Sequence, residues 1–186
     1  MIKNPNQPRI VTGKFKNFKL KVPKNARPLT ERVKIILFDT IKDIIDKSTI
    51  LDLFAGSGNF GIEALSRGAK LSIFVDSDKE AIECLKVNLS SLKLDKSTHK
   101  IFQIEYLDFV KTYTGNFDVI FIDPPFKIHS KINIEAISDL LAPEGVLIYK
   151  VEGVQKDLVK IPESLTIILE KNIGINTLLF ITKSTD

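Results

Sequence analysis

The chain has 186 residues, of which 44% are hydrophobic and 27% are charged, as in an ordinary soluble globular protein with room for one domain and a short arm. No apolar stretch approaches the roughly 20 residues that span a bilayer, and the N-terminus lacks the apolar core of a signal peptide, so we expect a cytoplasmic protein without membrane association. The single cysteine, Cys84, excludes an intrachain disulfide and a multi-cysteine metal site, and the two histidines show no metal-ligand spacing, so no metal is predicted.

The net charge of +4 is distributed unevenly along the chain. Residues 1–34 contain ten lysines and arginines against one acidic residue, Glu31, so this segment carries +9 and the remainder carries −5. A basic arm on a slightly acidic body favours an anionic polymer such as a nucleic acid as partner, although lysines of this kind also occur as plain solvated surface. The candidate nucleic-acid-binding residues are Lys14, Lys16, Lys19, Arg27 and Arg32.

Residues 11–22 alternate apolar and basic side chains around Lys16-Asn17, a pattern that predicts a β-hairpin. The side chains expected to face inward or to stack are Phe15, Phe18, Leu20 and Val22. Two prolines follow this hairpin, and we place the one boundary of the chain there. The prediction is a basic N-terminal arm over 1–28, which is the candidate nucleic-acid contact, and a second unit over 29–186.

Short apolar runs alternate with helical patterns in the rest of the chain. Apolar residues at helical spacing predict a helix over 29–46, and a capping-box pattern opens another that ends near residue 92. A glycine at position 68 is placed to end a helix over 59–67. Further helical stretches are expected near residue 109 and over 132–141. Strands are predicted at 50–54, 71–75, 101–106, 118–122, 146–151, 165–169 and 176–182.

The connections between these strands predict the fold. Only six residues separate the last two strands, which is too short for a parallel crossover, so this pair should be antiparallel. The earlier strands alternate with helices, as in a parallel sheet. We therefore predict an α/β protein with a doubly wound, Rossmann-like, mostly parallel seven-stranded sheet, one antiparallel strand near the C-terminus, and an N-terminal β-hairpin arm.

In such a sheet the ligand crevice lies at the carboxyl ends of the strands, and the polar residues of interest follow those ends. After the first strand, residues 54–61 spell Phe-Ala-Gly-Ser-Gly-Asn-Phe-Gly, whose glycines allow a tight turn and close approach of a ligand to a helix N-terminus. Carboxylates follow the next strands at Asp76, Asp108 and Asp123. Together they could fix the hydroxyls and amines of a nucleoside cofactor, although each alone could be a helix cap or a turn former.

Residues 56–61 also match the dinucleotide fingerprint G-x-G-x-x-G, with Asp76 about 20 residues further on, so a nicotinamide-dependent enzyme is a competing interpretation. Three features argue against it. Asp52 lies inside the first strand, where it could reach a cationic amine. Residues 123–126 have no role in hydride transfer, and the reversed terminal strand pair departs from the usual dinucleotide-binding sheet.

The most informative motif is Asp-Pro-Pro-Phe at 123–126, directly after the apolar run 119–122. Proline fixes φ and removes a backbone donor, so the turn is stiff and its carbonyls are left to accept hydrogen bonds. Acceptors of this kind can hold an amine while the aromatic side chain covers a flat ring such as a nucleobase, whereas the alternative is a strand that simply ends in a Pro-Pro turn. The candidate catalytic residues are Asp123, Pro124, Pro125 and Phe126.

Four segments resemble one family. They are Arg-Ile-Val-Thr-Gly-Lys-Phe at 9–15, Arg-Pro-Leu-Thr-Glu-Arg-Val at 27–33, Leu-Asp-Leu-Phe-Ala-Gly-Ser-Gly at 51–58 and Ile-Glu-Ala-Leu-Ser-Arg-Gly-Ala at 62–69. Over nearly its whole length the chain resembles the RsmD-type bacterial 16S rRNA guanine-(2-amino) methyltransferases of class I. The glycine loop is shared by many methyltransferases, and the N-terminal segment is more specific. Residues 149–152 depart from the family pattern, so no function is placed on Glu152.

The resemblance implies S-adenosylmethionine as cofactor, a methyltransferase domain over 29–186 that depends on it, and an RNA contact for the arm over 1–28. The cofactor-binding residues that it suggests are Asp52, Phe54, Gly56, Gly58, Asp76 and Asp108. In this interpretation the glycine backbone passes close to the methionine moiety, and Asp52 helps to neutralise its α-ammonium. Asp76 would accept the ribose hydroxyls, a task suited to a carboxylate with two oxygens, and Asp108 would accept from the adenine amine.

The resemblance also implies a reaction and a partner. Methyl transfer to an exocyclic amine would use the Asp123 carboxylate and the Pro124 carbonyl as acceptors for the amine hydrogens, while Phe126 stacks on a base that has left its helix or loop. The expected partner is 16S rRNA, within a small-subunit particle, and the chain is expected to be a monomer.

Two alternatives stay open. Asp-Pro-Pro-Phe serves adenine amines in RNA or DNA as well as guanine, and the tetrapeptide alone does not separate these substrates. From another class, the chain could be a non-catalytic RNA-binding or ribosome assembly factor, although such a protein has no need of Asp52, Gly56, Gly58, Asp76 and Asp123 together.

Overall fold

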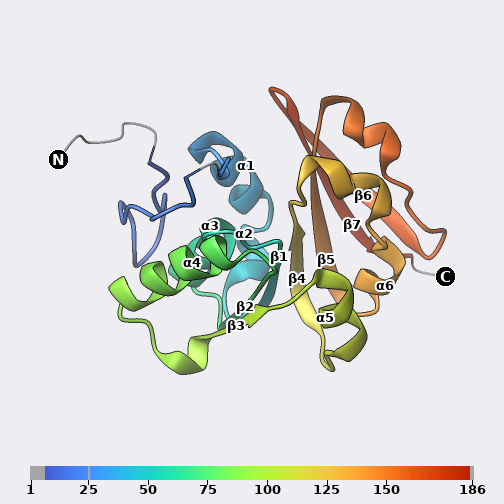
Figure 1. Cartoon of the computed structure of the whole chain (residues 1–186). Coiled ribbons are helices and arrows are strands. Elements are labelled where there is room, and N and C mark those ends of the chain that lie inside the picture. Colours follow the sequence, from blue (N-terminus) through green and yellow to red (C-terminus); the bar gives the residue numbers. More distant parts are fainter. Residues whose placement is uncertain (1–6, 25, 185–186) are drawn as a thin grey trace.

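A computed structural model describes residues 7–24 and 26–184. They form one seven-stranded sheet in the order β3-β2-β1-β4-β5-β7-β6 (Figure 1). Neighbouring strands are parallel except that β7 is antiparallel to both β5 and β6, which confirms the predicted fold class. The strands are β1 (Thr49–Leu53), β2 (Leu71–Asp76), β3 (His99–Gln103), β4 (Phe117–Ile122), β5 (Leu141–Glu152), β6 (Leu165–Ile173) and β7 (Asn176–Lys183).

Helices cover both faces of the sheet (Figure 1). The α-helices are α1 (Glu31–Thr40), α2 (Lys42–Ile45), α3 (Asn59–Ser66), α4 (Lys79–Ser91), α5 (Tyr106–Thr112) and α6 (Ile134–Ser138), and the 3-10 helices are η1 (Lys96–Thr98), η2 (Phe126–Lys131) and η3 (Gly153–Leu158). Successive strand residues point to opposite faces, so Phe74 packs with α1, α3 and α4 whereas its neighbours Ile73 and Val75 pack with α5 and α6. The result is a doubly wound fold with a core on each face.

Local sequence explains where the helices begin. The Thr30 side chain accepts a hydrogen bond from the Val33 backbone N–H and caps α1, and Asp78 does the same for α4 through Ala81. Gly68, at φ 107°, follows α3 in the left-handed conformation that glycine adopts without strain.

Several element boundaries differ from the sequence prediction. The helix expected over 29–46 breaks at Ile41 into α1 and α2, and β5 begins at Leu141, which shortens the helix expected over 132–141. Strand β3 ends at Gln103 instead of continuing to residue 106. The residues that follow it turn into α5 because Tyr106 and Phe109 pack into the core at helical spacing.

The N-terminal segment, residues 7–24, packs on the face of the sheet that α1, α3 and α4 cover, instead of forming a two-stranded ladder. The hairpin predicted over 11–22 takes the form of a loop closed by one antiparallel bridge, Arg9 to Lys19. Ile10 and Leu20 are fully buried in the core shared with α1, α3 and α4, so this segment contributes to the folded body. Residues 1–6 of the predicted arm lie outside the described residues.

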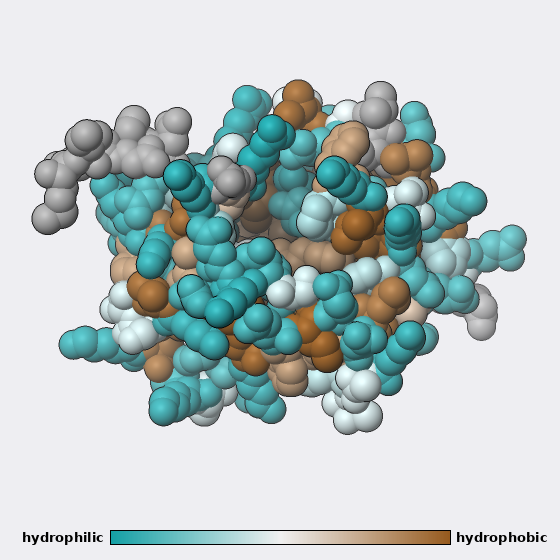
Figure 2. Space-filling model, viewed as in Figure 1, coloured by the Kyte–Doolittle hydropathy of each residue, from teal (hydrophilic) through white to brown (hydrophobic). Residues whose placement is uncertain are grey.

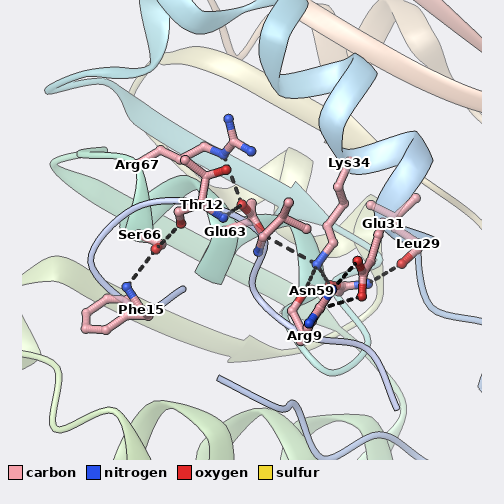
Figure 3. A network of polar contacts seen from close by, with 11 residues as sticks. Arg9, Thr12, Phe15, Leu29, Glu31, Lys34, Asn59, Glu63, Ser66 and Arg67 are labelled. Carbon is pink, nitrogen blue, oxygen red and sulfur yellow. Dashed lines mark hydrogen bonds and ion pairs between the residues drawn. The ribbon is translucent and has the colours of Figure 1, made fainter. Parts of the chain in front are cut away.

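One buried carboxylate, Glu63 on α3, fastens the N-terminal segment to the helices. Its two oxygens accept the backbone N–H groups of Val11 (2.8 Å) and Thr12 (3.0 Å). Lys34 of α1 and Arg67 approach the same carboxylate from opposite sides, at 3.4 and 3.0 Å (Figure 3). Glu63 and Lys34 are both fully buried, so each neutralises a charge that water does not reach.

The other contacts of Lys34 connect this cluster to the loop after β1. Its ammonium donates to the Arg9 backbone carbonyl and to Asn59 Oδ1 at 2.9 Å, and the Asn59 amide donates to the Leu29 carbonyl at 3.0 Å (Figure 3). Asn59 is the first residue of α3. The N-terminal segment, α1 and the start of α3 are therefore fixed to one another by a single hydrogen-bonded network.

Replacing Glu63 tests this network. Glu63→Ala leaves the Lys34 ammonium and two backbone N–H groups without their buried partner, so we expect a loss of about 3–5 kcal/mol in the free energy of unfolding, measured by urea titration. The matched control is Glu80→Ala, because Glu80 also accepts a backbone N–H from the N-terminal segment (Lys24, 3.1 Å) but is exposed. The control should lose less than about 1 kcal/mol. Equal losses in the two variants would contradict the special role of Glu63.

Candidate functional site

Strand register places the candidate residues side by side at the carboxyl edge of the sheet. Leu53 pairs with Val75 on one side and with Ile122 on the other, so Phe54, Asp76 and Asp123, which follow these residues, leave neighbouring strands together. The predicted site residues of β1, β2 and β4 therefore meet in space.

The turn after β1 has the conformation that its glycines predict. Phe54, Gly56 and Gly58 have φ values of 69°, 56° and 81°, and Gly58 precedes the first residue of α3. A Cβ atom on Gly58 would lie 2.5 Å from the Leu85 side chain, so this glycine allows α3 to pack against α4. A Cβ atom on Gly56 would meet nothing within 4 Å, so Gly56 faces open space. Phe54 adopts its positive φ without the freedom of glycine.

A small cavity of about 190 Å³ lies beside this turn and contains the carboxylate of Asp52. Asp52 is only 2% exposed, and its Oδ2 accepts the Gly61 backbone N–H at 2.9 Å. Among the described residues, no lysine or arginine is within ion-pair distance of it. Burial, together with the nearby charges of Asp76 and Asp123, raises the pKa of Asp52 well above its usual value, against the Gly61 hydrogen bond. A ligand with a cationic group would relieve this unbalanced charge.

Asp76 holds the loops after β1 and β2 together. Its Oδ2 accepts the Gly56 backbone N–H at 2.7 Å, and its Oδ1 accepts that of Asp78 at 2.9 Å. Burial raises the pKa of Asp76 although both hydrogen bonds lower it. Each carboxylate oxygen has a second lone pair, so Asp76 can also accept hydroxyl groups of a ligand.

A larger cavity of about 840 Å³ continues from the first, because Arg27, Phe54 and Asp123 line both. Figure 2 shows this face of the molecule hollowed near the centre of the view, with hydrophilic side chains around the hollow. Residues 124–126 line the larger cavity, and Phe126 is 68% exposed there. A large aromatic side chain in this position is available to stack on a ring.

Asp123 has an ion-pair partner that the sequence did not predict. Lys150 on β5 donates to Asp123 Oδ1 at 2.9 Å and to Glu152 Oε1 at 3.0 Å. Burial raises the pKa of the Asp123 carboxyl, and the charge and hydrogen bond of Lys150 oppose this rise without cancelling it. Burial lowers the pKa of Lys150, but Asp123 and Glu152 more than offset that effect and raise it.

His129, which contacts Tyr149, supports the Pro-Pro turn. His129 is buried, its Nδ1 lies 3.0 Å from the Tyr149 hydroxyl, and a hydrogen bond joins it to the Pro124 carbonyl. Burial lowers the pKa of His129, with a smaller contribution in the same direction from Lys150 and an opposing one from the Pro124 hydrogen bond. The ring is therefore neutral near pH 7, and it fixes the orientation of the turn.

The structure does not bring Asp108 to the cavities. The sequence analysis placed Asp108 just after the third strand, but β3 ends earlier and Asp108 lies exposed in the first turn of α5. Glu105, which precedes α5, lines the larger cavity instead. Gly58 lies behind the loop and does not line either cavity.

Of the candidate nucleic-acid-binding residues, Arg27 alone lines the cavities, and the other four are exposed elsewhere. Lys14, Lys16 and Lys19 belong to the N-terminal segment, and Arg32 is on α1. Within the part of the chain that the structure describes, no group of three or more histidine, cysteine, aspartate or glutamate residues could hold a metal ion. In that same part, no helix is long and apolar enough to cross a membrane.

Comparisons of the sequence find close relatives. A family model described as "Conserved hypothetical protein 95" matches residues 8–182. "Ribosomal RNA small subunit methyltransferase D" of Haemophilus influenzae is 39% identical over 186 aligned positions, which cover 94% of this chain and 94% of that protein. The protein of the same name from Escherichia coli is 32% identical over 93% of this chain and 91% of its own length.

Comparisons of the structure also find relatives that cover nearly the whole chain. A solved structure from Escherichia coli, described provisionally as a methyltransferase, superposes with a TM-score of 0.85 at 28% identity and covers 97% of this chain and 99% of that one. A structure from Haemophilus influenzae, described provisionally as a methylase, gives a TM-score of 0.78 at 34% identity over 95% and 98% of the two chains.

The unbalanced charge of Asp52 generates a prediction about stability. A carboxyl whose pKa is raised by folding stabilises the fold fully below its unfolded pKa and loses that contribution as the pH rises through the folded pKa. Asp52→Asn keeps an oxygen to accept the Gly61 N–H but carries no charge. We therefore expect the variant to melt a few degrees above the wild type at pH 8 and to lose this advantage near pH 4, as measured by calorimetry. A lower melting temperature for the variant at pH 8 would contradict this account.

Proposed function

Because the chain belongs to the RsmD family of ribosomal RNA small subunit methyltransferases, we propose that it transfers a methyl group from S-adenosylmethionine to the exocyclic 2-amino group of a guanine in 16S rRNA. The observation that carries the proposal is the stiff Asp-Pro-Pro-Phe turn, whose Asp123 lines both cavities and whose other residues line the larger one. In keeping with such a substrate, we place the reaction in the cytoplasm, on RNA within a small-subunit particle, and treat the enzyme as a monomer.

The residues around the smaller cavity fit the cofactor. The buried carboxylate of Asp52 has no cationic partner among the described residues, and the α-ammonium of a methionine moiety would supply one. Gly56 faces open space, so the loop backbone can be approached closely by a ligand. Asp76 has lone pairs left for the two ribose hydroxyls, and Glu105, just before α5, replaces Asp108 as the carboxylate at the larger cavity. When bound, S-adenosylmethionine supplies an electrophilic methyl group on a sulfonium sulfur.

The turn after β4 fits a nucleobase amine. The lone pair of such an amine is delocalised into its ring, so the nitrogen is a weak nucleophile. Asp123 and the Pro124 carbonyl can each accept one amine hydrogen, which favours a more tetrahedral nitrogen and directs its lone pair. The carboxylate also opposes the positive charge that develops on the nitrogen. Phe126 is exposed enough to stack on a base that has left its helix or loop.

The exposed basic residues fit a polyanion. Lys14, Lys16 and Lys19 are carried by a segment that is docked on α3, and Arg27 lies at the cavities themselves. Phosphate contacts of this kind position a nucleic acid without reading its sequence. The same surface therefore supports an RNA substrate, whereas the choice of nucleotide depends on the cavities.

The decisive test is incubation with methyl-labelled S-adenosylmethionine and small-subunit ribosomal RNA, either naked or in partly assembled particles, followed by nucleoside analysis. Label in 2-amino-methylated guanosine is the expected result. Label in an amine-methylated adenosine would keep the chemistry and overturn the substrate. Absence of label from every RNA, in a protein that binds the cofactor, would favour a non-catalytic RNA-binding factor or a DNA substrate.

The role of Asp123 can be tested separately. Asp123→Ala removes the amine acceptor but leaves Asp52 and Asp76 in place, so we expect methyl transfer to fall by at least about 100-fold while the affinity for S-adenosylhomocysteine stays within about twofold. The readouts are single-turnover rates and calorimetric titration. Asp118→Asn is a matched control, because Asp118 lies on the same strand but accepts an exposed backbone N–H from Thr49. Turnover at the wild-type rate in Asp123→Ala would refute the assignment.

The basic surface can be tested by charge reversal. Deleting the N-terminal segment would uncover Ile10 and Leu20, so point substitutions are the cleaner experiment. We expect the combined Lys14→Glu, Lys16→Glu and Lys19→Glu variant to bind RNA at least about tenfold more weakly, with a shallower salt dependence, and to bind cofactor normally. The same reversal at Lys86, Lys93 and Lys96, which border a different hollow beside α4, is the control. Equal losses in both variants would show that net charge, not this segment, governs binding.

A further inference from the structure

Lys150 occupies an unusual position for a lysine. It lies near the end of the interior strand β5, is 8% exposed, and contacts two carboxylates, Asp123 at 2.9 Å and Glu152 at 3.0 Å. The contact with Asp123 follows from strand register. Ile122 of β4 pairs with Tyr149 of β5, so the residues that follow them, Asp123 and Lys150, lie side by side. From the sequence, no function was placed on Glu152, and Lys150 was not among the predicted site residues.

The ion pair makes the two carboxylate oxygens of Asp123 inequivalent. The ammonium of Lys150 is bonded to Oδ1, and Glu152 holds the ammonium from its other side. The three charged groups together carry one net negative charge, so the lysine does not make the cluster positive. Such a cluster can still favour an amine that becomes cationic during the reaction.

We propose that Lys150 is a positioning residue for methyl transfer: it fixes Oδ1 of Asp123 as an ionised carboxylate and leaves Oδ2 to accept a hydrogen of the substrate amine. This inference rests on the proposed function, and it extends that function to a residue beyond the Asp-Pro-Pro-Phe motif. Lys150 acts through Asp123 and does not itself take part in the transfer.

The reason that Asp123 needs such a partner is its environment. Burial favours the neutral form of the carboxyl, and a protonated carboxyl would be a poorer acceptor for an amine hydrogen. Among the other charged or titratable groups around Asp123, Glu152 and Asp52 are acids, which also disfavour ionisation. Tyr149 and His129 are held neutral by burial, the first with a raised pKa and the second with a lowered one.

Arg27 is the other cation that lines the same cavities, but it is exposed and makes no ion pair with Asp123. Lys150 is therefore the cation that opposes the neutralisation of Asp123 in the part of the chain that the structure describes. Removing its charge raises the pKa of Asp123 further, so the carboxylate form is lost at a higher pH than in the wild type.

The first experiment compares Lys150→Met, Lys150→Arg and the wild type in methyl transfer to RNA across a range of pH. Lys150→Met keeps the length of the side chain and removes the charge. We expect it to reduce kcat by about tenfold or more near pH 6 and to recover most of the activity near pH 9, with KM for RNA little changed. Lys150→Arg should restore the wild-type pH profile. A loss of equal size at every pH, or a gain in activity, would overturn the proposal.

The second experiment needs no turnover. The protein is labelled with ¹³C at the aspartate side-chain carboxyl carbons, the Asp123 resonance is assigned from Asp123→Asn, and its titration is followed in the wild type and in Lys150→Met. The midpoint should move to higher pH in the variant, and an unchanged midpoint would overturn the role of Lys150. If no RNA is methylated by the wild type, the proposed function fails, whereas this titration still decides the role of the lysine.

Discussion

The carboxylate of Glu63 is the interaction on which the arrangement of this protein most depends. Buried in the middle of α3, it binds the N-terminal segment through two backbone N–H groups and is neutralised by Lys34 and Arg67. Because α3 begins at the glycine loop, the same network that fastens the N-terminal segment also fixes the helix that shapes the smaller cavity. The stability of the fold and the geometry of the site therefore share one set of contacts.

Two buried carboxylates, Glu63 and Asp52, and the partly buried Asp123 are balanced in different ways, and the difference indicates what each is for. Glu63 has two cationic partners and two backbone donors, which is the pattern of a structural charge. Asp123 has one cationic partner, Lys150, and lines both cavities. Asp52 is paired with no lysine or arginine among the described residues. A carboxylate left in that state is explained by a ligand that brings the missing positive charge.

Local patterns in the sequence were sufficient to predict the sheet, its one reversed strand and the meeting of Asp52, Gly56, Asp76 and Asp123, because strand ends and tight turns depend on neighbouring residues. They did not predict side-chain contacts that depend on how segments far apart in the sequence pack together. The Lys150 ion pair depends on the register of β4 and β5, and the contact of His129 with Tyr149 depends on how η2 folds back over the sheet. Asp108 was expected just after β3 but lies in α5. Strand β3 ends early because the residues after it form a helix whose apolar side chains pack into the core. The hairpin was reduced to one bridge because its backbone donors found partners on α3 instead.

The docking of the N-terminal segment also constrains how a large polyanion can be recognised. Lysines on a flexible arm would raise affinity for RNA without fixing its orientation, since phosphate contacts carry no positional information of their own when the donor moves. Here the backbone between Ile10 and Leu20 is bonded to α3, and Asn88 of α4 accepts the Lys21 backbone N–H and donates to the Lys21 carbonyl. The backbone that carries the basic side chains of this segment therefore keeps a defined position relative to the glycine loop. An RNA strand held by these side chains would present its bases to the Asp-Pro-Pro-Phe turn from a fixed direction. Such a fixed direction is required if one base amine among many is to be positioned at the turn.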